Sequence, residues 1–301
     1  MRSNACNDRA HAGIARTSFY RVVRVTDSSE PMAGQTVLVT GATSGIGLEA
    51  ARALAGRSAH VIVGARDRVR GQAVVDEIIA TGGRAQLLVI DLASFDSIRR
   101  AAEQLSKSQD KLDVLVNNAG TAVRRRQLSP DGHELTWATN FLGSFLLTRL
   151  LVPLLKKSPD PRIVNVSSEG HRTGRIDWNN LELEHGYGTF RAYANSKLAQ
   201  ALFTRELARR EPGIASVVVH PGSVATRIWS PAPKPIQWIL RLVLRSAANG
   251  AAPVVRLASA PDLQRVSGRY FDRFREAVPS PAARNDADAA RLWNLAESET
   301  S

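Results

Sequence analysis

The stretch Thr40-Gly41-Ala42-Thr43-Ser44-Gly45-Ile46-Gly47 decides the fold of this chain. It lies between an apolar, β-branched run and a helical pattern. Gly41 permits a tight turn, Gly45 lets the backbone approach a pyrophosphate, and Gly47 allows the helix to pack closely on the strand. The free N–H groups and positive dipole end at the start of that helix attract phosphate. The spacing is GxxxGxG, not the GxGxxG of the general fingerprint, but in this context it predicts a dinucleotide site that includes Thr43, Ser44 and Ile46.

Short apolar runs alternate with helical stretches along the rest of the chain. We expect strands over residues 35–40, 60–64, 84–90, 112–116, 162–166 and 216–219, and helices over residues 45–55, 67–80, 94–106, 133–156 and 191–210. Pro153 would kink the longest of these helices near its end. Continuous apolar strands are typical of a parallel sheet that is buried on both faces. The alternation therefore predicts right-handed βαβ units and an α/β fold with one doubly wound parallel sheet and helices on both faces.

The end of the second expected strand indicates which dinucleotide would bind. Ala65 stands where an NAD-selective site holds an acid, and Arg66 follows it. A guanidinium can stack on adenine and bind a 2′-phosphate, so we expect NADP(H) to be preferred, with NAD(H) as the alternative. Arg68 and Arg70 could add to the positive field. The alternative is that Arg66 is a surface arginine that caps a helix.

Tyr193 and Lys197 are four residues apart on an expected helix, so they lie on the same face of it. A phenol has a pKa near 10, and an adjacent ammonium stabilises the phenolate and lowers that pKa toward the working range. The pair therefore predicts a device for proton transfer.

Together these motifs resemble the short-chain dehydrogenase/reductase family, from Met32 to the C-terminus, and the resemblance implies a Rossmann-type fold. Further motifs that carry it are Asp91-Leu92, Asn117-Asn118-Ala119-Gly120, Asn140, Asn165-Val166-Ser167-Ser168, and Pro221-Gly222 with Thr226.

The resemblance implies roles for individual residues. Ser168 would hydrogen-bond the substrate oxygen, Tyr193 would transfer the proton, Lys197 would bind the nicotinamide ribose, and Asn140 would hold a water that connects Lys197 to solvent. The implied cofactor-binding residues, beside those of the glycine turn and Arg66, are Asp91, Leu92, Asn117, Ala119, Gly120, Tyr193, Lys197, Pro221, Gly222, Val224 and Thr226.

Within the family, the long segment between Ser168 and Tyr193 and two C-terminal motifs, Ser267 to Phe271 and Ala290 to Trp293, resemble the retinol-dehydrogenase-like branch. This implies an NADP(H)-dependent oxidoreductase acting on a small lipophilic carbonyl or alcohol substrate. A 3-oxoacyl-carrier-protein reductase, docked by its basic surface, and a cofactor-sensing interaction module of low activity are the alternatives. Apolar helices over residues 141–155 and 197–207 predict a homodimer or homotetramer, with burial inside one monomer as the alternative.

Composition excludes several other classes of protein. The single cysteine, Cys6, permits no intramolecular disulfide and favours a reducing compartment, so we expect a cytoplasmic protein. Six histidines show no metal-ligand spacing, and we expect no metal. The net charge of +12 is spread along the chain without a nucleic-acid-binding motif, so we expect no nucleic-acid partner.

The sequence shows no pattern that is typical of a membrane anchor. No run of 18 or more apolar residues occurs, so we expect no transmembrane segment, although residues 236–244 could contact a membrane surface peripherally. Residues 1–31 lack hydrophobic periodicity and are expected to form a disordered leader, with Met32 as a candidate true start. Residues 32–301 would form one domain, in which residues 226–250 are a candidate substrate lid or a helical excursion that completes the core.

Overall fold

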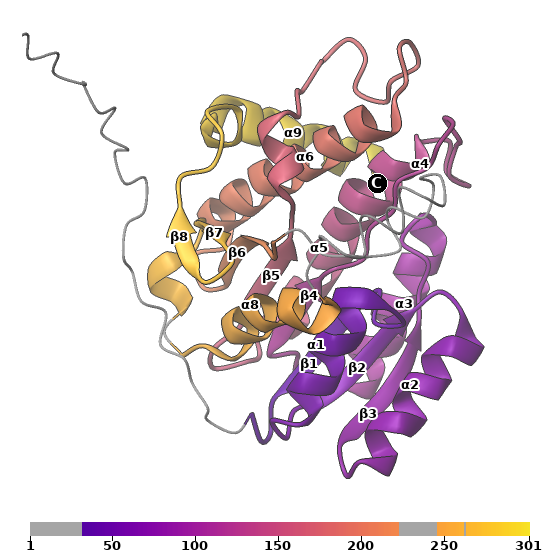
Figure 1. Ribbon diagram of the computed structural model, residues 1–301, viewed down its shortest axis with the longest axis vertical. Coiled ribbons are helices and arrows are strands. Elements are labelled where there is room, and N and C mark those ends of the chain that lie inside the picture. The colour runs from indigo at the N-terminus through magenta and orange to yellow at the C-terminus, as the bar shows by residue number, and fades with distance from the viewer. Residues whose placement is uncertain (1–31, 223–245, 262) are drawn as a thin grey trace, which may run out of the picture.

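The computed structural model describes residues 32–222, 246–261 and 263–301. These residues form one eight-stranded sheet in the order β3-β2-β1-β4-β5-β6-β7-β8 (Figure 1). The first seven strands of the chain pair in parallel, and β8 pairs antiparallel with β7. The strands are β1 Thr36–Thr40, β2 His60–Ala65, β3 Arg84–Val89, β4 Val114–Asn117, β5 Arg162–Val166, β6 Ala215–His220, β7 Tyr270–Asp272 and β8 Arg275–Ala277. The doubly wound parallel sheet predicted from the sequence is confirmed.

Helices cover both faces of this sheet, because successive strand residues point to opposite sides (Figure 1). Leu38 and Leu115 belong to one fully buried core, with helices α3 Phe95–Ser108, α5 Gly143–Leu155, α6 Thr189–Arg210 and α9 Asp286–Glu299. Val39 and Val116 belong to the other, with α1 Gly45–Ala55, α2 Arg68–Ala80 and α8 Ala247–Ser259. Each such buried side chain contributes about 1.5–3 kcal/mol to folding, which makes the sheet a rigid platform for the loops at its edge.

The helix predicted over residues 133–156 is interrupted. It begins as α4 Leu135–Trp137, widens into a π-helical turn over Ala138–Leu142, and continues as α5. The Glu134 carboxylate caps its start by accepting hydrogen bonds from the backbone N–H groups of Thr136 and Trp137. Pro153 lies in the last turn of α5, two residues before the helix ends.

That helix is also the one described helix long and apolar enough to cross a membrane. Over Leu135–Leu155 the mean hydropathy of its most apolar window is 1.4, and 78% of that window is buried inside the protein. Core helices of globular domains pass the same test of length and composition, so this helix is weak evidence for a membrane span.

The C-terminal elements complete the core in a way that the sequence did not predict. Helix α9 packs against α5 and α6, and the Trp293 ring lies 5.0 Å from Phe145 and 5.8 Å from Phe203, measured between centroids. Short 3₁₀ turns at Leu263–Val266 and Ala282–Arg284 connect the remaining pieces. The apolar faces that suggested an oligomer are therefore largely covered within one chain, and the oligomeric state stays a prediction.

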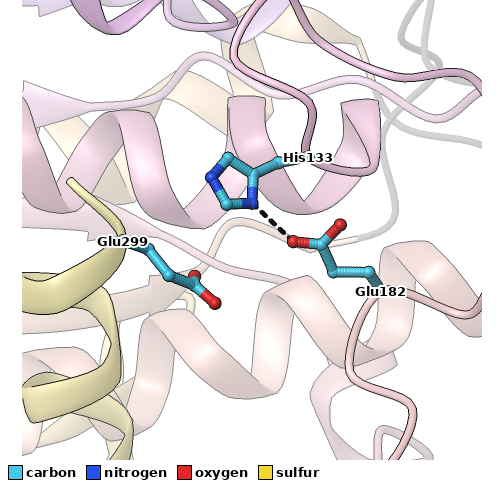
Figure 2. Close-up of side chains that lie close together, drawn as sticks. All are labelled: His133, Glu182 and Glu299. Atoms are coloured by element: carbon cyan, nitrogen blue, oxygen red, sulfur yellow. Dashed lines mark hydrogen bonds and ion pairs between the residues drawn. The ribbon is translucent and has the colours of Figure 1, made fainter.

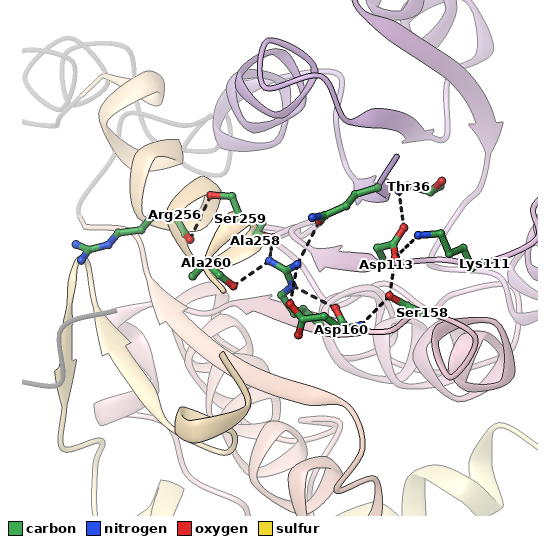
Figure 3. Close-up of polar contacts among 11 residues, drawn as sticks. Thr36, Lys111, Asp113, Ser158, Asp160, Arg256, Ala258, Ser259 and Ala260 are labelled. Carbon is green, nitrogen blue, oxygen red and sulfur yellow. Dashed lines mark hydrogen bonds and ion pairs between the residues drawn. The ribbon is translucent and has the colours of Figure 1, made fainter. Parts of the chain in front are cut away.

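A buried polar network ties the elements together at the opposite end of β5 from the site described below (Figure 3). Arg162 is 2% exposed, and its Nη1 donates to the carbonyl oxygens of Ala258 and Ala260, each at 2.9 Å. These carbonyls lie at the C-terminal end of α8, where the helix dipole favours a cation. Asp160 approaches the same guanidinium at 3.1 Å. Arg162 thus anchors α8, the helix that follows the undescribed residues 223–245.

Candidate active site

A cavity of about 960 Å³ lies at the carboxyl ends of the parallel strands, where ligands bind in open α/β sheets. Most of the residues predicted from the sequence line it: Gly41, Thr43, Ser44, Gly45, Ile46, Arg66, Asp91, Leu92, Ala119, Gly120, Ser168, Tyr193, Lys197, Pro221 and Gly222. Gly47, Asn117 and Asn140 are not on its wall. Val224, Thr226 and most of the candidate lid lie outside the described residues.

The glycine turn has the geometry that the sequence predicted. Gly41 and Gly45 have φ values of +66° and +57°, in the left-handed region that favours glycine. A Cβ on Gly47 would lie 2.5 Å from the Gly41 carbonyl oxygen, so only glycine lets α1 pack this closely. Ser44 is the N-cap residue of α1, and its side chain makes no capping hydrogen bond. The first N–H groups of α1 are therefore not capped by that side chain and are available to a phosphate.

Asn118 holds the turn against the end of β4. Its Nδ2 donates to the Thr40 carbonyl oxygen at 2.9 Å, and its backbone N–H donates to the Thr40 hydroxyl at 3.0 Å. Asn118 also lines the cavity. Asn117 instead points into the sheet interior and donates to Asn165 Oδ1 at 2.9 Å and Thr148 Oγ1 at 3.0 Å. Of the two adjacent asparagines, Asn117 braces the sheet, as the resemblance also implied, and Asn118, which was not among the expected cofactor-binding residues, faces the cavity.

Two arginines stand at the end of the cavity beside β2. Arg66 is exposed and lines the cavity, and Arg70 in the first turn of α2 lines it too. Arg70 Nη2 donates to the Thr43 carbonyl oxygen at 3.1 Å, which directs its guanidinium over the glycine turn. Within the described part of the chain, neither guanidinium forms an ion pair with a carboxylate. Both are therefore available to an anionic group, and Arg70 is a stronger candidate than the sequence indicated.

At the other end of the cavity, Tyr193 and Ser168 are hydrogen-bonded to each other. Tyr193 is 8% exposed, and burial raises the pKa of its phenol, although the bond with Ser168 opposes that rise. Lys197, which we expected to lower this pKa, is not among the causes of the shift. The Lys197 Nζ lies 5.6 Å from the centre of the phenol ring, and burial lowers the pKa of the ammonium to about 7.

Two acceptors hold the Lys197 ammonium. Its Nζ donates to the Val166 carbonyl oxygen and to Gln200 Oε1, both at 2.9 Å. Val166 is the last residue of β5, and Gln200 lies one turn further along α6. The ammonium is thus held at the floor of the cavity, below the strand ends.

Asn140 lies in the π-helical turn, directly behind Gly120. A Cβ on Gly120 would lie 3.5 Å from Asn140 Oδ1 and 3.6 Å from Lys197 Nζ, which places the two groups close together. The Asn140 amide exchanges hydrogen bonds with the backbone of Thr121, at 2.7 and 3.0 Å, and donates to Ser196 Oγ at 3.0 Å. These groups engage both the oxygen and the nitrogen of the Asn140 amide. A water here would have to bind the main-chain carbonyl oxygen of Asn140 or a remaining lone pair of Asn140 Oδ1.

Two histidines that the sequence analysis did not single out hold the loop that carries Ser168. His171 is fully buried, with Nδ1 2.8 Å from the Ser168 carbonyl oxygen, and its Nε2 accepts from the Ser280 N–H at 3.2 Å. His220 Nδ1 accepts from the Glu169 N–H at 3.2 Å. Burial lowers the pKa of both imidazoles. His220 comes directly before the Pro221-Gly222 motif, but no local pattern predicts that His171 meets Ser280.

A separate cluster joins the start of α4, the loop before α6 and the end of α9 (Figure 2). His133 Nδ1 lies 2.6 Å from Glu182 Oε1, and Glu299 brings a carboxylate oxygen within 4.8 Å of both. Burial, reinforced by the charge of Glu182, raises the pKa of Glu299, while His133 opposes the rise. Among the described residues, Glu299 Oε2 is buried without a hydrogen-bond partner, so Glu299 is a neighbour of the bonded pair His133 and Glu182.

Comparisons with known proteins agree with this fold and site. The family model described as short chain dehydrogenase matches residues 35–236, which is more than half of the chain. The chain belongs to this family and is an NAD(P)-dependent oxidoreductase acting on alcohol or carbonyl groups.

The relatives place it within the retinol-dehydrogenase-like branch. Retinol dehydrogenase 11 of Homo sapiens is 40% identical over 277 residues, which cover 90% of this chain and 87% of the relative. The crystal structure of an uncharacterized protein from Mycobacterium Paratuberculosis has a TM-score of 0.74 at 33% identity and covers 90% of this chain and 95% of that chain. A short chain dehydrogenase from Escherichia coli CFT073, complexed with NADPH, has a TM-score of 0.66 at 26% identity, covering 82% and 99%.

Proposed function

We propose that this protein transfers a hydride between NADP(H) and a lipophilic carbonyl or alcohol, with Tyr193 as general acid and base. The observation that carries the proposal is the arrangement of Ser168, Tyr193 and Lys197 at one end of a cavity whose other end is a phosphate cradle. The cradle fits a dinucleotide, since Gly41 and Gly45 form a tight turn with positive φ at the start of α1 and the Ser44 side chain leaves the N–H groups of α1 uncapped. Bound NADPH would supply the hydride.

The chain's own residues manage the proton and the charge. Ser168 Oγ would donate to the substrate carbonyl oxygen, which gains negative charge as the hydride reaches its carbon. Tyr193 would give its phenolic proton to that oxygen, completing an alcohol and leaving a phenolate. Lys197 would stabilise this phenolate and return a proton to it, and its pKa of about 7 suits exchange near neutral pH. Asn140, beside Nζ, would hold the water that connects Lys197 to solvent.

NADP(H) is the expected cofactor because two arginines stand beside the expected place of the 2′-phosphate. Arg66 and Arg70 both line that end of the cavity, and position 65 holds an alanine where an NAD-selective site holds an acid. Asp91, which lines the same cavity, would accept a hydrogen bond from the adenine amino group. The Arg66→Ala variant should raise the KM for NADPH about tenfold or more and leave that for NADH within about twofold. Equal changes for both cofactors would remove the specificity assigned to Arg66.

A lipophilic substrate is supported by the wall beside Tyr193 and by the relatives. The Phe190 ring is 52% exposed and lines the cavity three residues before Tyr193, where it offers an apolar surface. The human relative is named for retinol, which is a lipophilic alcohol. Residues 226–250, which begin a few residues after Gly222, remain our candidate for the lid.

A screen of aldehydes, ketones and alcohols with both NADPH and NADH tests the proposal. We expect turnover with NADPH and higher kcat/KM as the apolar part of the substrate grows. Turnover restricted to carrier-linked 3-oxoacyl groups would favour the acyl-carrier-protein reductase, to which the charge of +12 points. NADPH binding without turnover of any substrate would favour the sensing module. A cytoplasmic location and a homo-oligomer stay predictions, the second testable by light scattering.

A further inference from the structure

Gln200 is a buried side chain beside the site that no step above requires. It is fully buried on α6, and its Oε1 accepts a hydrogen bond from Lys197 Nζ at 2.9 Å. Its main-chain carbonyl accepts from the Thr204 hydroxyl at 2.7 Å, which is an ordinary helical contact. The side-chain amide oxygen is therefore directed at the ammonium alone.

The other half of this amide is unsatisfied. Within the described residues, Gln200 Nε2 is buried without a hydrogen-bond partner. A buried donor without an acceptor is unfavourable for folding, and an apolar side chain of similar size would fill the same space without that cost. The reverse orientation of the amide is excluded because it would place its N–H groups against the donors of Lys197. Packing does not explain this residue, whereas its contact with Lys197 does.

The surroundings of Lys197 contain little else that stabilises its charge. Its second acceptor is the Val166 carbonyl oxygen, and Tyr193, on the same helix, is the titratable group beside it. From the opposite side, Asn140 and Gly120 bring only neutral groups. No carboxylate among the described residues contacts the ammonium, and burial is the cause of its lowered pKa. One amide oxygen therefore has a large share in keeping the proton on Nζ.

We propose that Gln200 is a positioning residue that holds the Lys197 ammonium at the floor of the site and sets the pH range over which Lys197 keeps its proton. This rests on the proposed function only in that Lys197 supplies protons to Tyr193. Removing the amide oxygen should shift the titration of Lys197 to lower pH, because the buried charge loses an acceptor. A carboxylate in its place should shift the titration to higher pH, because the negative charge stabilises the ammonium.

The test is the titration of Lys197, followed by NMR of protein labelled at lysine ¹³Cε and assigned by comparison with Lys197→Met. In the Gln200→Leu variant we expect the midpoint to fall by about one pH unit or more, and in Gln200→Glu to rise by about as much. Gln104→Leu, which alters an exposed glutamine on α3, is the matched control and should titrate like the wild type. If Gln200→Leu does not fold, Gln200→Asn, which is too short to reach Nζ, carries the same expectation.

Midpoints in both Gln200 variants within about 0.3 units of wild type would overturn the inference, since a merely structural glutamine would not shift them. The pH profile of kcat/KM provides a second readout, and its limb assigned to Lys197 should move in the same directions. The NMR titration needs no substrate. Shifted midpoints in a protein without turnover would therefore uphold the role of Gln200 and contradict the proposed function.

Discussion

The change Gly47→Ala adds one methyl group to the glycine turn and tests why this turn has its shape. A Cβ at this position would lie 2.5 Å from the Gly41 carbonyl oxygen and closer still to Asn118 Nδ2. Ordinary contacts begin at 3.4 Å, so the gap must open by nearly 1 Å. The backbone of Gly41 cannot yield without moving the start of α1. Asn118 can move only by giving up its hydrogen bond to Thr40.

These losses give the size of the effect. Overpacking costs about 1–3 kcal/mol, and the lost hydrogen bond adds about 1 kcal/mol. Alanine recovers up to about 1 kcal/mol through its higher helix propensity. We therefore expect a net loss of stability of about 1–3 kcal/mol. Because the same displacement moves the N–H groups of α1, NADPH should bind about tenfold more weakly or worse.

Thermal unfolding and a fluorescence titration with NADPH measure the two effects. Gly213→Ala is the control, because no atom lies within 4 Å of its added Cβ and its φ is not in the left-handed region. We expect this control to match the wild type in both assays. The argument for the turn fails if Gly47→Ala binds NADPH within twofold of wild type and keeps its melting temperature.

Three further predictions concern the network around Arg162, the buried carboxyl of Glu299 and the loop of Ser168. Arg162→Met leaves two carbonyl groups at the end of α8 without their donor. The free energy of unfolding, measured in urea, should fall by about 3–5 kcal/mol, while the KM for substrate stays unchanged. A fall below about 1 kcal/mol would contradict this. Burial raises the pKa of Glu299 above 4.5, so the folded state holds this proton more tightly than the unfolded state, and the protein loses stability as pH rises through the folded-state pKa. Glu299→Gln should remove this loss. A difference in melting temperature between Glu299→Gln and wild type that does not grow with pH would refute it. His171→Phe keeps a ring against Tyr270 but removes the hydrogen bonds to the Ser168 carbonyl and the Ser280 N–H. Because Ser168 would then be held less precisely, kcat should fall more than tenfold while the affinity for NADPH stays unchanged. An unaltered kcat would show that Ser168 is held without His171.

Local signals explain which parts of this molecule were predictable. The glycine spacing of residues 40–47 and the apolar runs of β1 to β6 act over a few residues, so the turn and the parallel sheet follow from the sequence. A period of 3.6 residues does not show where one extra residue widens a helix, so the π-helical turn around Asn140 could not be predicted. Its effect depends on Thr121 and Ser196, which only the fold brings to it.

The electrostatics of the site depended on the fold as well. The spacing of Tyr193 and Lys197 predicts their common helix face, but not that the Val166 carbonyl and the Gln200 amide accept hydrogen bonds from the ammonium. Likewise, the apolar faces of α5 and α6 suggested a second subunit, and the sequence did not show that Trp293 of α9 packs on Phe145 and Phe203 in the same chain. Contacts between residues distant in sequence decide these features, and a single sequence does not contain them.

The most direct test of the proposed mechanism compares wild type with Tyr193→Phe. The ring stays buried, so packing is retained, and only the hydroxyl that meets Ser168 is removed. NADPH should bind within about twofold of wild type, because the phosphate cradle is untouched, while kcat falls by about 10²–10⁴. A variant that binds NADPH and keeps kcat within about tenfold of wild type would contradict Tyr193 as the proton donor.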